Sequence, residues 1–181
     1  MIIFDTETTG LSLPGVADLS QQPRIIDFAA VKLSRMGKGK VWRQTRIQHL
    51  INPGVPISPE ITKITGYTDH DLRDAPPFAA VLRDIAHFFL GERVMLAHNL
   101  PFDKSLLEFE LRRLDLVTNF PWPPVQACTV SLYTEAFGRR PKLTELYERR
   151  LGKPLRQLHK AMADVEALLE IVLKDELHLK L

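Results

Sequence analysis

The chain has 181 residues, is 45% hydrophobic and 25% charged, and carries a formal net charge of +2, which is ordinary for one soluble globular domain spanning residues 1–181. Its longest apolar stretches are far shorter than a membrane span and none opens the chain as a signal peptide would, so no membrane association is expected. The single cysteine, Cys128, excludes an internal disulfide and fits a cytoplasmic location. The lack of a Cys/His cluster speaks against zinc.

The first third of the chain is predicted to be mostly strand. Residues 1–7 have the pattern of a buried strand, and a loop with prolines and glycine covers residues 12–24. Strands over residues 25–34 and 41–51, joined by a turn at residues 36–40, form a hairpin. A short helix over residues 58–64 follows, with Ser58 as N-cap and Pro59 at the first helical position.

The remaining elements alternate. Apolar periodicity predicts helices over residues 78–90, 103–114, 129–137, 143–151 and 159–177, with short strands at residues 94–97 and 126–128. Early antiparallel strands followed by alternating strands and helices indicate an α/β sandwich. We therefore expect a central mixed five-stranded sheet flanked by helices, antiparallel at one edge and parallel in its centre.

Two acids close the first strand. Asp5 and Glu7 lie two residues apart in IIFDTETTG, so strand geometry directs both to one face of the sheet. Two like charges this close raise each other's pKa unless a cation holds both ionised. A pair of solvated acids at the strand end is the alternative.

Three further residues lie beside apolar runs in the second half. Asp103 opens an amphipathic helix on its inward side, although a helix N-cap is the simpler interpretation. Asp164 interrupts an apolar stripe, where an ion pair with a nearby arginine is the alternative. His159 lies five residues before Asp164 and could accept a proton from an attacking water.

The proposed ligands are all hard oxygen donors. Carboxylates without thiolates favour Mg²⁺ or Mn²⁺ over zinc. Two such ions suit phosphodiester hydrolysis, because they orient the attacking water and stabilise charge on the attacking and leaving oxygens. The four acids Asp5, Glu7, Asp103 and Asp164, with His159, therefore predict a metal-dependent enzyme.

Basic residues gather in two stretches. No acid occurs between Phe28 and Pro59, and the segment from Arg139 to Lys160 carries many more cations than acids. Solvated surface is the plain interpretation of each stretch. The second leads directly into His159, which favours a footprint for a polyanion such as nucleic acid.

At these residues the chain resembles the DnaQ-like (DEDD) 3′–5′ exonucleases of the ribonuclease H-like superfamily. FDTETTG, AHNLPFD and HKAMAD resemble the three motifs of this family in their order. The histidine five residues before Asp164 matches the histidine subgroup, since the tyrosine subgroup needs a tyrosine at the position of Lys160. The resemblance covers nearly the whole chain and implies a ribonuclease H-like three-layer sandwich.

The resemblance also implies residue roles. Asp5, Glu7 and Asp164 would bind one ion, Asp5 would bridge to a second ion held with Asp103, and His159 would deprotonate the attacking water. Contacts to the terminal nucleotide would involve Thr6, Thr8, Leu11, Glu60, Thr65, His98, Asn99 and Phe102. The chain departs from many relatives at Thr65-Gly66-Tyr67 and Cys128-Thr129.

The expected activity is removal of nucleoside 5′-monophosphates from the 3′ end of single-stranded or frayed DNA. RNA trimming, proofreading within a DNA polymerase assembly, and a binding module without catalysis remain as alternatives. The chain ends soon after its last helix, which favours a stand-alone or phage-type exonuclease over a polymerase-tethered subunit.

Overall fold

The computed structural model describes residues 1–35, 42–156 and 159–181. Its five strands form one sheet in the order β3-β2-β1-β4-β5. They are β1 (Ile2–Thr8), β2 (Ile25–Arg35), β3 (Trp42–Leu50), β4 (Val94–Ala97) and β5 (Val125–Cys128). Strands β1 to β3 pair antiparallel, whereas β4 pairs parallel with both β1 and β5. The predicted mixed sheet is confirmed, while the expected turn at residues 36–40 lies outside the described residues.

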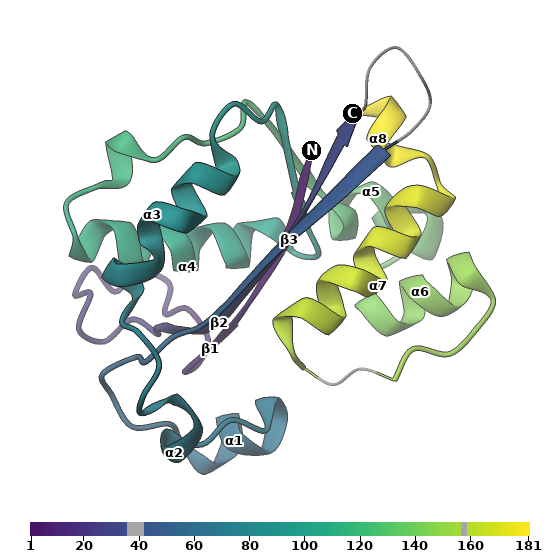
Figure 1. Ribbon diagram of the computed structural model, residues 1–181. Coiled ribbons are helices and arrows are strands. Elements are labelled where there is room, and N and C mark those ends of the chain that lie inside the picture. Colours follow the sequence, from purple (N-terminus) through teal and green to yellow (C-terminus); the bar gives the residue numbers. More distant parts are fainter. Residues whose placement is uncertain (36–41, 157–158) are drawn as a thin grey trace.

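Helices cover both faces of the sheet (Figure 1). One face packs against α3 (Phe78–Phe89) and α4 (Leu100–Arg113), and the other against α6 (Leu143–Leu151) and α7 (Ala161–Lys174). Strand alternation explains this division, because Ile2, Phe4 and Phe28 face α3 and α4 while Ile3 and Val31 face α7. The result is the three-layer α/β sandwich that the sequence predicts.

The other helices are short and lie at the margins. They are α1 (Pro59–Thr65), α2 (Asp69–Leu72), the 3₁₀ turn η1 (Val117–Asn119), α5 (Thr129–Phe137) and α8 (Leu177–Lys180). Helix α1 begins as predicted, with the Ser58 hydroxyl accepting a hydrogen bond from the Ile61 amide and Pro59 in its first turn. Within the described ranges, none of these helices has the length and apolarity to cross a bilayer.

Two predicted helix starts need correction. Helix α4 begins at Leu100, three residues before the predicted start, and its N-cap is Asn99. Asp103 is therefore within the first turn of the helix, and the interpretation of Asp103 as an N-cap is wrong. Helix α7 begins at Ala161 rather than at His159, and ends at Lys174 before a separate α8.

Candidate active site

The acidic pair lies at the end of the central strand β1. Pairing of β1 with β2 shifts register between Glu7 and Thr8, so the ladder becomes irregular directly after the second acid. Asp5 and Glu7 are half-buried although the strand around them is almost fully buried. Desolvation, followed by repulsion from Asp103, Asp164 and Glu7, raises the pKa of Asp5 well above its ordinary value. The acids therefore lie close enough to repel one another.

Asp103 reaches the same place from α4. Its side chain is 2% exposed, and its Oδ1 accepts hydrogen bonds from the Thr6 amide at 3.0 Å and the Thr6 hydroxyl at 2.8 Å. Burial raises the pKa of Asp103 to about 7, although the two hydrogen bonds from Thr6 favour the ionised form. Because Thr6 separates Asp5 from Glu7 on β1, these hydrogen bonds fix Asp103 beside the acidic pair.

The third segment is the start of α7. Asp164 lies in the first turn and is 6% exposed. His159 precedes the helix with φ 45°, an uncommon value for a residue other than glycine. Ligand atoms of Glu7, His159 and Asp164 all lie within 4.8 Å of one another. Glu7, His159 and Asp164 thus come together from β1 and the start of α7, and Asp103 of α4 is held beside Glu7 through Thr6.

The electrostatics of this group suit a divalent cation. Burial, followed by repulsion from Asp164, Asp27 and Asp103, raises the pKa of Glu7 to about 8. When neighbouring buried carboxylates raise one another's pKa, a bound cation stabilises their ionised forms by neutralising the charge. Oxygen ligands of this kind match Mg²⁺ or Mn²⁺. The residues present therefore fit the metal ions expected from the sequence.

The residues expected to contact the nucleotide differ in exposure. Leu11 is 78% exposed on the loop after β1, and Glu60 is exposed in the first turn of α1. By contrast, Thr6, Thr8 and Thr65 are buried, and their hydroxyls donate to Asp103, to the Gly10 carbonyl and to the Ile61 carbonyl. These three threonines therefore support the walls of the site through internal hydrogen bonds.

The remaining expected contacts flank the start of α4. His98 Nδ1 lies 2.9 Å from the Thr129 hydroxyl. Asn99 adopts the left-handed conformation with φ 68°, and its Oδ1 accepts a hydrogen bond from the Arg140 guanidinium at 2.7 Å. Phe102 is half-buried against the core between the sheet and α4. Asn99 thus connects the site to the basic segment after α5.

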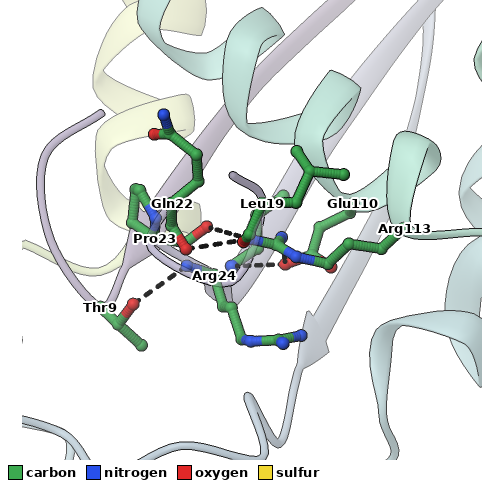
Figure 2. A network of polar contacts seen from close by, with 8 residues as sticks. Thr9, Leu19, Gln22, Pro23, Arg24, Glu110 and Arg113 are labelled. Carbon is green, nitrogen blue, oxygen red and sulfur yellow. Dashed lines mark hydrogen bonds and ion pairs between the residues drawn. The ribbon is translucent and has the colours of Figure 1, made fainter. Parts of the chain in front are cut away.

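A half-buried arginine, Arg113, fixes the loop that carries Leu11. Figure 2 shows that the Arg113 guanidinium donates to the carbonyls of Leu19, Gln22 and Pro23, at 2.8, 2.9 and 3.2 Å. Arg113 also pairs with Glu110 at 3.0 Å, and Glu110 accepts a hydrogen bond from the Ile25 amide. The loop therefore returns to β2 along a path that is set by α4.

Most cations of the second basic stretch have intramolecular partners. Arg139 pairs with Glu145, Arg150 with Asp175 and Lys153 with Glu170, while Arg149 donates to the Ala136 carbonyl. Pairing lowers the net positive charge that this surface offers to a polyanion. The nucleic-acid footprint remains a prediction. Within this stretch, Arg140 donates a hydrogen bond directly to Asn99, one of the residues expected to contact the nucleotide.

Sequence reasoning missed three residues beside the site. Asp27 on β2 pairs with Glu7 in the ladder and is fully buried, Tyr67 donates to it, and the Lys160 ammonium lies 3.1 Å from the centroid of the Tyr67 ring. Only Asp27 left a signal in the sequence, because it places a carboxylate inside the apolar run IIDFAAV.

Comparison with known sequences gives a consistent result. A family model described as RNase_T, exonuclease, matches residues 2–172. The chain is 29% identical over 174 residues to DNA polymerase III subunit epsilon of Haemophilus influenzae, covering 95% of this chain and 65% of that protein. It is 31% identical over 173 residues to the PolC-type DNA polymerase III of Bacillus subtilis, covering 96% of this chain but 11% of that protein. The chain thus spans less than two thirds of either relative.

Solved structures have the same fold. Exonuclease X, solved in complex with 5′ overhanging duplex DNA, superposes with a TM-score of 0.61 at 25% identity, covering 94% of this chain and 90% of that one. A full-length 3′-exonuclease superposes with a TM-score of 0.71 at 20% identity, covering 97% of this chain and 60% of that one. These neighbours confirm the expected ribonuclease H-like sandwich.

Proposed function

This chain belongs to the RNase_T exonuclease family, and we propose that it hydrolyses phosphodiester bonds from the 3′ end of DNA, releasing nucleoside 5′-monophosphates. One observation carries the proposal. Glu7, His159 and Asp164 lie within ligand distance of one another at the end of β1, with Asp5 and Asp103 beside them, and burial together with repulsion among the acids raises the pKa of Asp5, Glu7 and Asp103. This arrangement suits cation-assisted hydrolysis of a phosphodiester.

Two divalent ions, Mg²⁺ or Mn²⁺, are the proposed cofactors. Asp5, Glu7 and Asp164 would hold one, and Asp103 would help to hold the other, with Asp5 shared. When bound, these ions stabilise the negative charge that develops on the attacking and leaving oxygens. The hydrogen bonds from Thr6 keep the Asp103 carboxylate oriented toward β1.

His159 is the proposed general base. It would accept the proton of the attacking water, and its position beside Glu7 and Asp164 supports this role. The exposed side chains of Leu11 and Glu60 are suited to border the terminal nucleotide. Arg140, which donates to Asn99, would contribute positive charge to the nucleic-acid backbone.

DNA is the preferred substrate in this proposal. The support is the similarity over 94% of this chain to exonuclease X, which was solved with duplex DNA carrying a 5′ overhang. We therefore expect activity on single-stranded or frayed 3′ ends. RNA enters the test as the competing substrate, because one side-chain contact to a 2′-hydroxyl can decide between them.

The test uses DNA and RNA labelled at the 5′ end, single-stranded or duplex, with Mg²⁺ and with EDTA. The expected result is a ladder that shortens from the 3′ end of DNA with Mg²⁺ only. Asp164→Asn should abolish the ladder, whereas Glu166→Gln, two residues further along α7 and half-exposed, should retain it. Internal cuts, EDTA-insensitive cleavage or full activity of Asp164→Asn would contradict the proposal.

A second candidate is proofreading beside a DNA polymerase. It is favoured by the similarity to DNA polymerase III subunit epsilon, which extends over 95% of this chain. A proofreading enzyme should remove a mismatched 3′ nucleotide faster than a paired one and should co-purify with a polymerase. Equal rates and no bound polymerase would favour a stand-alone exonuclease.

We propose a cytoplasmic location for either activity, which the single free cysteine supports.

A further inference from the structure

A fifth acid lies beside the four proposed metal ligands. Asp27 is fully buried and stands opposite Glu7 in the β1–β2 ladder. Burial is the largest cause of its raised pKa, and hydrogen bonds from Gln48, Tyr67 and the Ala161 amide oppose that rise. A buried carboxylate next to other acids is costly, so its retention calls for a physical reason.

The first contact of Asp27 is with the start of α7. Its Oδ2 accepts a hydrogen bond from the amide of Ala161, the first residue of the helix, at 3.2 Å. The N-cap residue Lys160 provides no side-chain hydrogen bond to this end. Asp27 therefore does from β2 what an N-cap side chain normally does from the helix itself. Ala161 lies between His159 and Asp164 in the chain, so this hydrogen bond acts on the segment that carries both.

The second contact is with the segment after α1. The Tyr67 hydroxyl donates to the same Oδ2 at 2.9 Å. The ring of Tyr67 packs against the Lys160 ammonium, and a Cβ at Gly66 would lie 3.7 Å from that ammonium. Gly66 ends α1 in the left-handed conformation. Asp27 and Lys160 thus join α1, which carries the exposed Glu60, to the beginning of α7.

Asp27 is poorly suited to be a metal ligand itself. Its Oδ2 is engaged by Tyr67 and Ala161, and its Oδ1 accepts from the Gln48 amide at 3.1 Å. Both oxygens thus face donors from the protein.

We propose that Asp27 is a positioning residue that fixes the start of α7 and the end of α1 relative to β1, so that His159 and Asp164 face Glu7. This inference rests on the proposed metal-dependent activity. Residues that orient metal ligands typically change metal affinity or activity by about 10–100-fold when they are removed. Asp27 should act through geometry and not through its charge.

Asp27→Ala and Asp27→Asn separate geometry from charge. Asparagine can keep its oxygen toward Tyr67 and Ala161 while the Gln48 amide turns over, whereas alanine removes every acceptor. We expect Asp27→Ala to weaken Mn²⁺ binding, measured by calorimetry, by about tenfold or more, and Asp27→Asn to retain most of the affinity. In the metal-free protein, hydrogen exchange at the amides of residues 161–164 should accelerate in Asp27→Ala.

Asp175 provides a matched control at the other end of α7. It is also buried, is the C-cap of α7, and accepts from the Tyr133 hydroxyl and from Arg150. Asp175→Ala should lower thermal stability without changing Mn²⁺ affinity or exchange at residues 161–164. Equal Mn²⁺ affinity and exchange in Asp27→Ala and wild type would overturn the proposal, as would equal losses in Asp27→Asn and Asp27→Ala.

Two tyrosine variants keep the test decisive if Asp27→Ala does not fold. Tyr67→Phe removes one hydroxyl donor to Asp27 and leaves the ring under Lys160, and Tyr133→Phe removes the equivalent donor to Asp175. Of the two variants, only Tyr67→Phe should weaken Mn²⁺ binding. A wild-type protein that binds Mn²⁺ but cleaves no nucleic acid would refute the proposed function, while binding and exchange would still judge the role of Asp27.

Discussion

Thr6 gives both its backbone amide and its hydroxyl to one oxygen of Asp103, at 3.0 and 2.8 Å. The two residues are 97 positions apart in the chain, and both are nearly fully buried. This pair of hydrogen bonds directly connects the central strand to α4. It also lowers the pKa of a carboxyl that burial raises.

The first prediction concerns this hydroxyl. Thr6→Val keeps the shape of the side chain and the amide hydrogen bond but removes the hydroxyl donor. The pKa of Asp103 should then rise further and its carboxylate should be less well oriented, so the Mg²⁺ concentration for half-maximal cleavage should rise about tenfold. Thr6→Ser retains the hydroxyl and should stay close to wild type in the same titration. An unchanged Mg²⁺ requirement in Thr6→Val would show that the hydroxyl is dispensable.

The second prediction concerns pH. The pKa of Glu7 is raised from 4.5 to about 8, and that of Asp103 from 3.8 to about 7. At a pH between the ordinary pKa and the raised pKa of each group, the folded, metal-free protein keeps a proton on Glu7 or Asp103 that the unfolded chain has released. Stability must therefore fall as pH rises through this window, because the unfolded state binds fewer protons. A divalent cation that replaces the protons should stabilise the protein more strongly at the alkaline end.

Melting temperatures with EDTA and with Mg²⁺, measured at about pH 5.5 and about pH 8.5, check this prediction. The EDTA sample should melt lower at the higher pH, and the increase produced by Mg²⁺ should be larger there. Asp103→Asn carries no charge at that position, so it should flatten the pH dependence of the EDTA sample. A gain from Mg²⁺ that is independent of pH would contradict proton release on metal binding.

The third prediction concerns the loop between β1 and β2. Arg113→Ala removes three hydrogen bonds to loop carbonyls and leaves Glu110 buried without its ion-pair partner. Loss of one partner from a buried pair costs roughly 3 kcal/mol, which urea denaturation can measure. Because this loop carries the exposed Leu11, KM for DNA should rise more than kcat falls. Arg112→Ala, at the exposed neighbouring position, should change stability by less than about 0.5 kcal/mol. Equal effects of the two variants would contradict this role of Arg113.

The parts of the site that depend on residues close together in the sequence could be predicted, and those that depend on contacts between distant segments could not. Strand alternation is local, so the sequence correctly places Asp5 and Glu7 on one face of β1. The predicted start of α4 lies three residues late, because Pro101 occupies the first turn and Asn99 caps the helix in a left-handed conformation without a side-chain hydrogen bond. The Thr6–Asp103 and Asp27–Ala161 contacts join distant segments, and no local pattern predicts them.

Burial of polar side chains was also beyond a local pattern. Thr65, a predicted nucleotide contact, is 2% exposed and donates to the Ile61 carbonyl within its own helix, which no local pattern indicates. Charge counting likewise overstates the free positive charge after α5, since Arg139, Arg150 and Lys153 pair with acids from separate positions in the chain. Composition gives the number of charges, and only the fold decides which of them are neutralised.

The last prediction uses this difference between neighbouring arginines. Arg140 donates to Asn99 beside the proposed ligands, whereas Arg139 makes two hydrogen bonds to Glu145. If Arg140 contacts a phosphate of the bound strand, Arg140→Ala should raise KM and reduce the slope of log binding constant against log salt by about one. Arg139→Ala should change that slope much less, because its charge is already paired. Binding of single-stranded DNA in Ca²⁺ across a salt series gives both slopes without cleavage. Equal slopes for the two variants would show that Arg140 does not meet the backbone, and that the hydrogen bond to Asn99 serves only to hold the segment after α5 against α4.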